Sequence, residues 1–492
     1  MRDASRVFLT AWILLAAHFA TNLSREHYPA FSLAERGTLR VDPYLGLHSD
    51  LFEHTDGHAY VDNNVATSLV AAVPLFLCRP LLDALERRRL AEIAADPSAA
   101  QGTYRSEYPL RAEFYSEVRR RGLDLRFGAA AAVTAILLTA PLAALSAVLV
   151  HRVLARRGVP RARAAALALL SGFGTPVFFR TATLNPNLLV MVAVLGAFVL
   201  LLEDAEEPAP RPRRLLAAGL LAGAAVAFDY AGAVPAACLL GWVALERRSR
   251  AALATFVAGA VPPIGLLLAT QWIQFGNPFL PAQAWMPAVH YTDQGWRGFS
   301  WPRLDLLVAN LVDPDFGLFV YGPILVLALA PPGGRILPPG ARRFAVAASA
   351  LLLVFCAANQ YARMQWNSGF RHLLPIVPLL FLLACERLVR MRTAVFAAVA
   401  GLAVLHEWVL AMVRYHPQPK DLGHLASSAV VESWRRFLAE GVQLPWLTVL
   451  RRTAPEGSPV QAWYWPYAVL LACALLAALV WRAPRSAEAA AA

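Results

Sequence analysis

Stretches of about 20 apolar residues alternate with short polar segments from Val7 to Trp481. At 1.5 Å per residue, a helix of this length crosses roughly 30 Å of hydrocarbon. The pattern therefore predicts an all-α polytopic membrane protein with about 12 transmembrane helices. The spans are expected over residues 7–22, 127–151, 164–180, 184–202, 214–229, 231–246, 251–272, 318–332, 344–360, 373–387, 393–413 and 464–481.

Composition supports this prediction. The chain has 492 residues, of which 58% are apolar and only 16% charged, so the surface of a water-soluble protein could not be covered. A net charge of +12 is also typical of nucleic-acid binding. Here, however, the basic residues lie in short clusters between apolar runs, as the positive-inside rule requires. The expected partner is the lipid bilayer, and no nucleic acid is expected.

The segment Val65–Cys78 is apolar but short. Its 14 residues make about 21 Å of helix, less than a bilayer. If it does not cross, the side that holds the N-terminus has a net charge of +13 and the opposite side −1. If it crosses, this bias disappears. We therefore place it as a helix at the outer interface, with both termini cytoplasmic.

This topology divides the chain around one long outer loop. The loop is expected to contain an extended start from Glu26 to Asp62, the interfacial helix, and two polar helices near 82–95 and 105–122. A loop of about 100 residues is rarely without function, so chemistry is expected on this face. The parts are the first span (1–22), the outer loop (23–126), a bundle (127–413) with outer loops 273–317 and 361–372, an outer segment (414–463), and the last span with a cytoplasmic tail (464–492).

Acidic residues are concentrated in the first outer loop. Glu26 follows the first span almost directly, at the edge of low dielectric, where the pKa of a carboxyl can be tuned for general-base catalysis. Asp42 and Asp50 are alternatives, and each acid also fits a solvated loop residue. The histidines and aspartates between His48 and His58 match no known ligand spacing, so no metal site is expected.

Two other outer segments suit a phosphate or a sugar. Arg371 and His372 precede a span, where free backbone amides and the helix dipole favour an anion. Arg297 and Arg303 lie among tryptophans in the loop 273–317. All four side chains equally suit the lipid interface, with Trp366 as an aromatic-belt residue.

The turn Asp229-Tyr230 joins two apolar spans. A carboxylate beside hydrocarbon is costly and therefore a functional candidate. At the end of a helix it also reaches water, which is the alternative explanation.

Several segments, in order over about residues 7–380, resemble membrane glycosyltransferases of the GT-C superfamily. The resemblance is to the bacterial branch related to protein O-mannosyltransferases and lipid A aminoarabinose transferases. The segments are Arg25 to Asp42, Gly57 to Leu69, Gly174-Thr-Pro176, Asp229-Tyr230, Phe275-Gly-Asn-Pro278 and Trp366 to Pro375. At the positions where relatives carry an Asp-Glu pair before a tyrosine, this chain has Ser24 and Arg25, with the acid at Glu26.

The resemblance implies a glycosyltransferase of the bacterial cytoplasmic membrane that needs no cofactor. Its donor would be a polyprenyl-phosphate sugar, and its acceptor a lipid-linked glycan or a small lipid on the extracytoplasmic face. The resemblance also implies an acidic general base in the first outer loop, for which the candidates are Glu26, Asp42 and Asp50. The other predicted site residues are Arg371, His372, Arg297 and Arg303 for binding of the donor phosphate, and Tyr28, Tyr60, Asn64 and Trp366 for substrate binding.

Two other classes of function stay open. One is a non-catalytic transporter or flippase for lipid-linked glycans, which would show polar residues in mid-span or repeated halves. The other is a structural subunit of an envelope-assembly complex, which would tolerate the loss of every acid in the outer loop.

Overall fold

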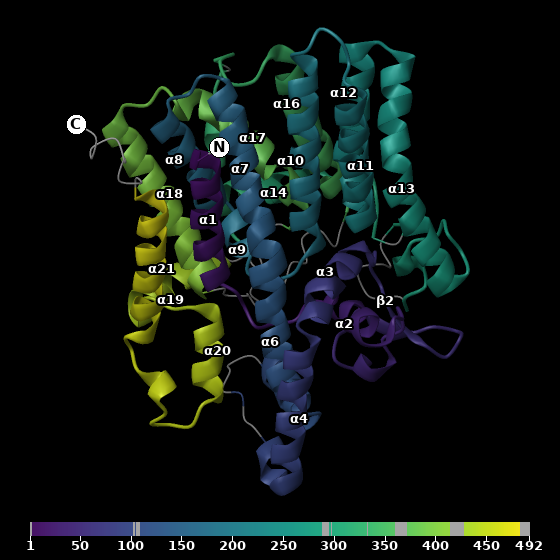
Figure 1. Cartoon of the computed structure of the whole chain (residues 1–492), viewed down its shortest axis with the longest axis vertical. Coiled ribbons are helices and arrows are strands. Elements are labelled where there is room, and N and C mark those ends of the chain that lie inside the picture. The colour runs from purple at the N-terminus through teal and green to yellow at the C-terminus, as the bar shows by residue number, and fades with distance from the viewer. Residues whose placement is uncertain are drawn as a thin grey trace, which may run out of the picture.

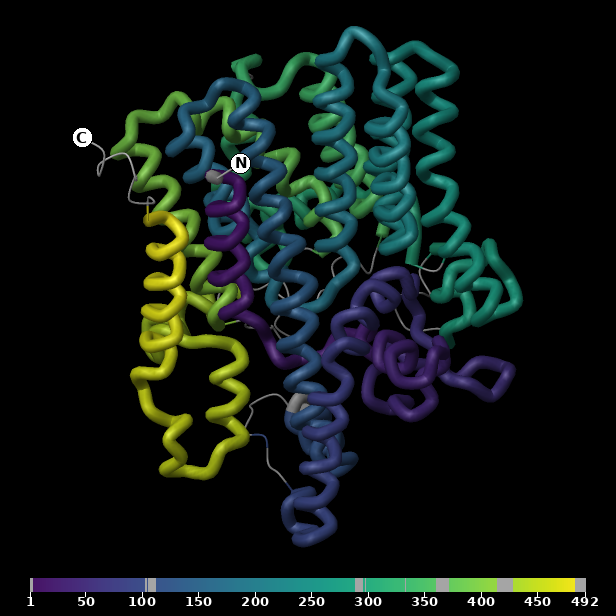
Figure 2. Tube along the Cα trace, viewed as in Figure 1, coloured from purple at the N-terminus to yellow at the C-terminus, as the bar shows by residue number. Residues whose placement is uncertain are grey.

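The computed structural model describes residues 2–101, 104, 109–287, 295–296, 298–331, 333–359, 371–413 and 428–482. The described chain is almost entirely helical, and its one sheet has two short strands. The predicted all-α fold class is thus confirmed. Long helices form a bundle, and the segment 23–95 lies beneath one end of it (Figures 1 and 2).

Helices cover the predicted spans, with one exception. They are α1 (Arg2–Ala17), α6 (Asp124–Thr134), α7 (Ala140–Arg156), α8 (Arg161–Phe173), α9 (Val177–Arg180), α10 (Pro186–Ala205), α11 (Pro212–Phe228), α12 (Ala233–Arg247), α13 (Arg250–Phe275), α16 (Pro339–Ala357), α17 (Val377–Leu388), α18 (Thr393–Val413) and α21 (Trp465–Trp481). A π-helical turn at Ala135–Thr139 joins α6 to α7 in one continuous helix.

The exception is the predicted span 318–332. The structure has only the single turn α15 (Leu318–Tyr321) and a 3-10 helix at Pro323–Leu329. Pro323 lacks the N–H that a continuous α-helix needs, and its ring disfavours helical backbone at Gly322. The segment therefore does not form a regular transmembrane helix, although its composition is apolar.

Five helices, within the part of the chain that the structure describes, are long and apolar enough to cross a membrane unaided. They are Asp124–Arg156, Pro186–Ala205, Arg250–Phe275, Pro339–Ala357 and Thr393–Val413. The pair α3 (Ala66–Leu77) and α4 (Arg79–Ala95) passes the same test jointly but is bent by 75°. Such a bend fits a broken or re-entrant segment, so our assignment of 65–78 to the outer interface stays a prediction.

The outer loop begins with a helix, not the predicted extended segment. Helix α2 (His27–Arg36) buries Tyr28, Phe31 and Ala34 and ends at Gly37, whose φ of +64° is the left-handed conformation common at helix ends. The remaining elements are β1 (Leu51–Glu53), β2 (Ala59–Val61), α5 (Pro109–Arg120), α14 (Leu304–Val312), α19 (Ala429–Glu440) and α20 (Pro445–Thr453).

A buried arginine joins three helices of the outer region. Arg126 of α6 is 6% exposed and forms ion pairs with Glu35 of α2 and with Asp83 and Glu86 of α4. An arginine removed from water requires such partners. These contacts fix α2 and α4 against the start of the long helix α6–α7.

Glycines set the close packing of α11 against α13. A Cβ atom added at Gly219 would overlap the carbonyl oxygen of Phe256, and one at Gly259 would overlap that of Leu216. Small residues four apart allow such backbone approach between membrane helices. This packing positions the C-terminal ends of both helices, which carry residues of the site described below.

The two ends of the described chain lie together. The Arg6 guanidinium donates to the carbonyl oxygen of Arg482, and Trp481 Nε1 donates to Thr10 Oγ1 at 2.8 Å. Helix α1 begins at the end of the bundle away from α2, α3 and α4 (Figure 1). Both ends of the described chain thus lie on one side of the bundle, and the cytoplasmic location of the termini is a prediction.

Labelling of single cysteines tests this orientation. Ala95 at the end of α4 and Ala209 between α10 and α11 are both exposed. With the five native cysteines replaced, Ala95→Cys should react with a membrane-impermeant thiol reagent in intact cells, whereas Ala209→Cys should react only after lysis. The opposite pattern would invert the topology.

Candidate functional site

Arg25 lies at the centre of a cluster of carboxylates just after α1. Its Nη1 contacts Asp50 Oδ2 at 2.9 Å and Asp62 Oδ1 at 2.8 Å. Its Nε contacts Glu26 Oε1 at 3.3 Å. Glu26 itself is 3% exposed. One guanidinium thus holds three carboxylates together.

The hairpin register explains why the two aspartates meet. Strands β1 and β2 are antiparallel, with Leu51 opposite Val61. Asp50 and Asp62 extend this ladder by one residue, and the backbone N–H of Asp62 donates to the carbonyl oxygen of Asp50 at 3.1 Å. Residues 12 positions apart in the sequence therefore present both carboxylates to Arg25.

The helical bundle contributes Asp229 and Arg371 to the same cluster. Asp229 follows α11 and accepts hydrogen bonds from the backbone N–H of Ala231 at 2.8 Å and from Asn187 Nδ2 at 3.4 Å. Arg371 begins the 3-10 helix Arg371–Ile376, which leads into α17. The positive charge of Arg371 acts on Glu26, Asp50 and Asp229. Loop and bundle thus form one site.

The ionisation of the acids follows from these neighbours. Burial acts to raise the pKa of Glu26, but the charge of Arg25, a hydrogen bond from Ser24 and the charge of Arg371 hold the pKa below its ordinary value. Arg25 and His48 likewise hold the pKa of Asp50 low against burial. At neutral pH both acids are negatively charged and able to accept a proton or a hydrogen bond.

Asp62 behaves differently although it contacts the same guanidinium. Burial raises the pKa of its carboxyl to about 7, and the charges of Asp50 and Glu26 act in the same direction against Arg25. Four carboxylates face two arginines in the cluster, so holding one proton lowers their mutual repulsion. Asp62 is the carboxyl that retains this proton.

A third arginine lies close to the cluster. Arg180 on α9 is 5% exposed, and its charge acts on His372 together with those of Arg371 and Arg25. Arg371 Nε is buried and has no hydrogen-bond partner among the residues that the structure describes. Positive groups from three separate segments therefore surround His372, which is buried. This arrangement suits an anion such as a phosphate.

The structure brings only some of the predicted residues together. Glu26, Asp50, Arg371 and His372 lie in the cluster, and Asn64 lies next to it, with Nδ2 donating to the Val226 carbonyl oxygen at 3.4 Å. Arg297 and Trp366 lie outside the described residues. Their predicted roles in binding phosphate and substrate stay predictions.

Other predicted residues have structural roles away from the cluster. Asp42 accepts a hydrogen bond from the backbone N–H of Ala59 at 2.6 Å and pairs with His58, so it braces the hairpin. Arg303 is exposed and forms a bidentate pair with Asp305. We therefore do not place Asp42 or Arg303 in the site.

The two predicted tyrosines are packed side chains. Tyr28 is fully buried among Tyr44, His48 and Phe127, and its hydroxyl donates to the Leu47 carbonyl oxygen at 3.3 Å. Tyr60 is buried and its hydroxyl donates to Asp56 at 2.9 Å. Both side chains stabilise the loop, and their predicted roles in substrate binding stay predictions.

Sequence reasoning missed four members of the site. Arg25 and Asp62 gain their roles only through the hairpin register, and Arg180 was taken as part of a span. Asn63 Nδ2 donates to Glu26 Oε1 at 2.8 Å. The Asn63-Asn64 pair immediately after Asp62 was the available signal, because two amides at the start of an apolar helix are unusual.

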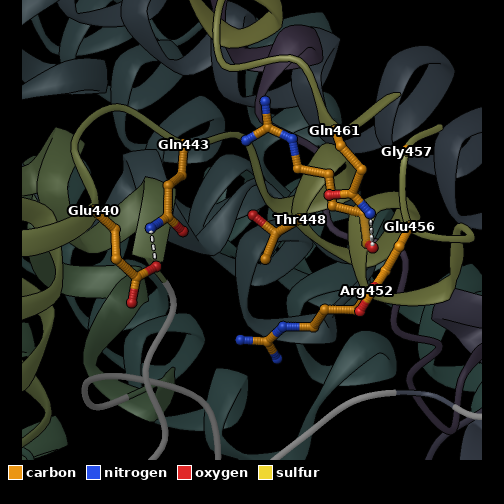
Figure 3. Close-up of a pocket in the computed structure, with 8 residues that line it drawn as sticks. Glu440, Gln443, Thr448, Arg452, Glu456, Gly457 and Gln461 are labelled. Carbon is orange, nitrogen blue, oxygen red and sulfur yellow. Dashed lines mark hydrogen bonds between the residues drawn. The ribbon is translucent and has the colours of Figure 1, made fainter. Parts of the chain in front are cut away.

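A separate cavity of about 450 Å³ lies beside α19, α20 and the turn at Pro459–Gln461 (Figure 3). Its lining is polar, and Gln443 Nε2 donates to Glu440 at 2.6 Å. It contains no residue of the cluster. The lining residues are Glu440, Gln443, Thr448, Arg451, Arg452, Glu456, Gly457 and Gln461.

Among the described residues, no three His, Cys, Asp or Glu side chains are placed to hold a metal ion.

Comparison with known proteins returns one similar structure. No family model matches the chain, and no curated protein matches it. The crystal structure of ArnT from Cupriavidus metallidurans bound to undecaprenyl phosphate is similar over 97% of this chain and 76% of its own, with 14% identity and a TM-score of 0.47.

Proposed function

We propose that the chain is a GT-C membrane glycosyltransferase. It takes a sugar from a polyprenyl-phosphate donor and passes it to a hydroxyl of a lipid-linked or small acceptor on the extracytoplasmic face. The observation that carries this proposal is the pairing of ionised carboxylates with the buried Arg25 at one end of an apolar bundle, with Arg371 near enough for its charge to lower the pKa of Glu26. Such a site provides both a base and a cationic environment for a phosphate leaving group.

In the proposed reaction, Glu26 accepts the proton of the acceptor hydroxyl as the hydroxyl oxygen attacks the anomeric carbon. The bond between that carbon and the phosphate oxygen breaks, and polyprenyl phosphate leaves with the electron pair. Arg371 stabilises the negative charge on the leaving group. Attack opposite the leaving group inverts the configuration of the anomeric carbon.

The contacts of Glu26 suit this role. Arg25 Nε and Asn63 Nδ2 both donate to Oε1, and neither of these bonds uses Oε2. Ser68 Oγ donates to the backbone carbonyl oxygen of Glu26 at 2.7 Å and so fixes the residue from α3. Asp50 is the alternative base, because it is also ionised and its side chain is 22% exposed.

One observation favours the transporter alternative. Glu407 lies within α18 and is fully buried, and neither of its carboxylate oxygens has a hydrogen-bond partner among the described residues. Ionisable residues inside spans often mark transport pathways. An assay of sugar transfer by protein in detergent distinguishes a transporter from a glycosyltransferase. A transporter in micelles has no membrane to act across and forms no new product, whereas a glycosyltransferase does.

Mass spectrometry of co-purified lipid tests the donor class. Protein purified in mild detergent should carry a polyprenyl phosphate or its glycosylated form, and Arg371→Ala should lower its amount relative to Arg390→Ala. Purified wild-type protein that carries only phospholipid, and does not bind added undecaprenyl phosphate, would contradict the proposed donor.

The ionisation of Asp62 predicts a pH dependence of donor binding. As pH rises through about 7, Asp62 loses its proton and adds a negative charge 2.8 Å from Arg25. The affinity for a polyprenyl phosphodiester, whose own charge is constant in this range, should fall by roughly threefold to tenfold between about pH 6 and pH 8. Asp62→Asn should remove this dependence. An equally steep dependence in the variant would assign the titration to another group.

A further inference from the structure

Three amide side chains around the C-terminal ends of α11 and α13 carry buried oxygen atoms that have no hydrogen-bond partner among the described residues. They are Asn64 Oδ1, Asn187 Oδ1 and Gln274 Oε1, and each residue is at most 5% exposed. Buried polar atoms of this kind are rare, because leaving one unsatisfied costs roughly 1–3 kcal/mol. Each of them therefore needs an explanation.

The unpaired atoms are oxygens because hydrogen bonds orient the amide nitrogens. Asn64 Nδ2 donates to the Val226 carbonyl oxygen at 3.4 Å, and Gln274 Nε2 to the Thr270 carbonyl oxygen at 3.1 Å. Asn187 Nδ2 donates to Asp229 Oδ2 at 3.4 Å. Flipping any of these amides would place its oxygen against another oxygen. The region therefore presents acceptors.

Packing between three helices brings these groups into one region. Ala66 of α3, Ala227 of α11 and Leu267 of α13 form a small buried cluster. Gln271 and Gln274 follow Leu267 by one and two turns on the same face of α13. Gln271 Nε2 contacts the hydroxyl of Tyr230, the neighbour of Asp229. The amides thus lie around the junction of α11 and α12.

The chemistry of this region defines its ligand. Three amide oxygens and the Asp229 carboxylate accept hydrogen bonds, so the ligand must bring several donors, as the hydroxyls of a sugar ring do. A carboxylate on the ligand would be repelled by the negative charge of Asp229. The three amide oxygens would also offer it no hydrogen-bond donor. The charge of Arg371 acts on Asp229, so a phosphate held there would be adjacent.

We propose that Asn64, Asn187, Asp229 and Gln274 form the subsite for the donor's sugar and that this subsite selects a neutral, hydroxylated sugar over a uronic acid. The proposal rests on the proposed function, because it takes the sugar to be attached to a phosphate at Arg371. Asn64 is the residue of this subsite that the sequence predicted for substrate binding. Asn187 and Gln274 are newly assigned to the site.

Gln274→Met tests the subsite, because methionine keeps the length of the side chain and removes the amide. Binding to purified protein is measured for undecaprenyl phosphate and for undecaprenyl-phosphate sugars carrying glucose, mannose, arabinose, glucuronate or galacturonate. Gln101→Met, at an exposed glutamine of the outer loop, is the matched control. Asn187→Leu is the second variant, in case Gln274→Met fails to fold.

Wild-type protein should bind its best neutral donor at least tenfold more tightly than either uronate donor. Gln274→Met should lower the affinity for that neutral donor by about tenfold. Its affinity for undecaprenyl phosphate should change less than twofold, and this retained binding also shows that the variant is folded. Gln101→Met should match wild type for both ligands.

The failures are distinguishable. If wild type binds neutral donors but Gln274→Met and Asn187→Leu do so equally well, or if a uronate donor binds as tightly, the subsite is wrong and the proposed function stands. If wild type binds neither undecaprenyl phosphate nor any glycosylated form, the proposed function fails and the subsite with it.

Discussion

Replacing Glu26 with glutamine is expected to lower the rate of sugar transfer by about two to four orders of magnitude, the usual contribution of a general base. The substitution keeps the volume of the side chain, and the amide oxygen can still accept the bonds from Arg25 and Asn63. Donor binding should therefore change little. Transfer is measured as product formed per protein, with bound undecaprenyl phosphate as the check on folding.

Matched substitutions of other acids locate the base. Glu53→Gln, at an exposed position on the same hairpin, should leave the rate near that of wild type, and so should Asp42→Asn, which lies outside the cluster. If Glu26→Gln stays active and Asp50→Asn does not, the base is Asp50. Full activity in Glu26→Gln, Asp42→Asn and Asp50→Asn would mean that transfer needs no general base from among these acids.

The second large effect concerns the phosphate. Arg371→Ala should weaken the binding of undecaprenyl phosphate by about tenfold to a hundredfold, because a charge-assisted contact to a partly desolvated anion contributes roughly 1.5–3 kcal/mol. The Arg371 side chain is partly exposed, and its buried Nε has no hydrogen-bond partner within the part of the chain that the structure describes. Its positive charge is thus available to a ligand.

Arg390→Ala is the control for this measurement. Arg390 follows α17, and its Nη2 donates to the carbonyl oxygen of Gly333 at 3.1 Å. It takes no part in the cluster, so its loss should change affinity less than twofold at the same ionic strength. Equal affinities for the two variants would make Arg371 a structural or interfacial arginine, and the phosphate would have to be sought at Arg180.

The sequence was sufficient to predict most of the helices, because the length of an apolar run is a local property. It failed at 318–332, where composition is apolar but Pro323 prevents a continuous helix. It also failed at α2, whose apolar face is buried by contacts with distant residues such as Phe127. Amphipathic packing of a short helix depends on partners that the local pattern does not reveal.

The site was predictable in its individual members but not in its assembly. Glu26 and Arg371 stood out because each lies beside a span. Arg25 and Asp62 did not, since their roles depend on the pairing of β1 with β2. The structure gives Tyr28 and Asp42 contacts within the loop, which the sequence alone could not distinguish from roles in substrate binding or catalysis.

The most direct test of the proposed function is a transfer assay with purified protein in detergent, an undecaprenyl-phosphate sugar labelled in the sugar, and a bacterial lipid extract as the source of acceptor. We expect the label to move to a lipid or glycan acceptor with release of one undecaprenyl phosphate per sugar transferred, and we expect Glu26→Gln to abolish both. Donor that binds to wild-type protein but returns unchanged, across the panel of neutral sugars, would contradict the assignment as a glycosyltransferase.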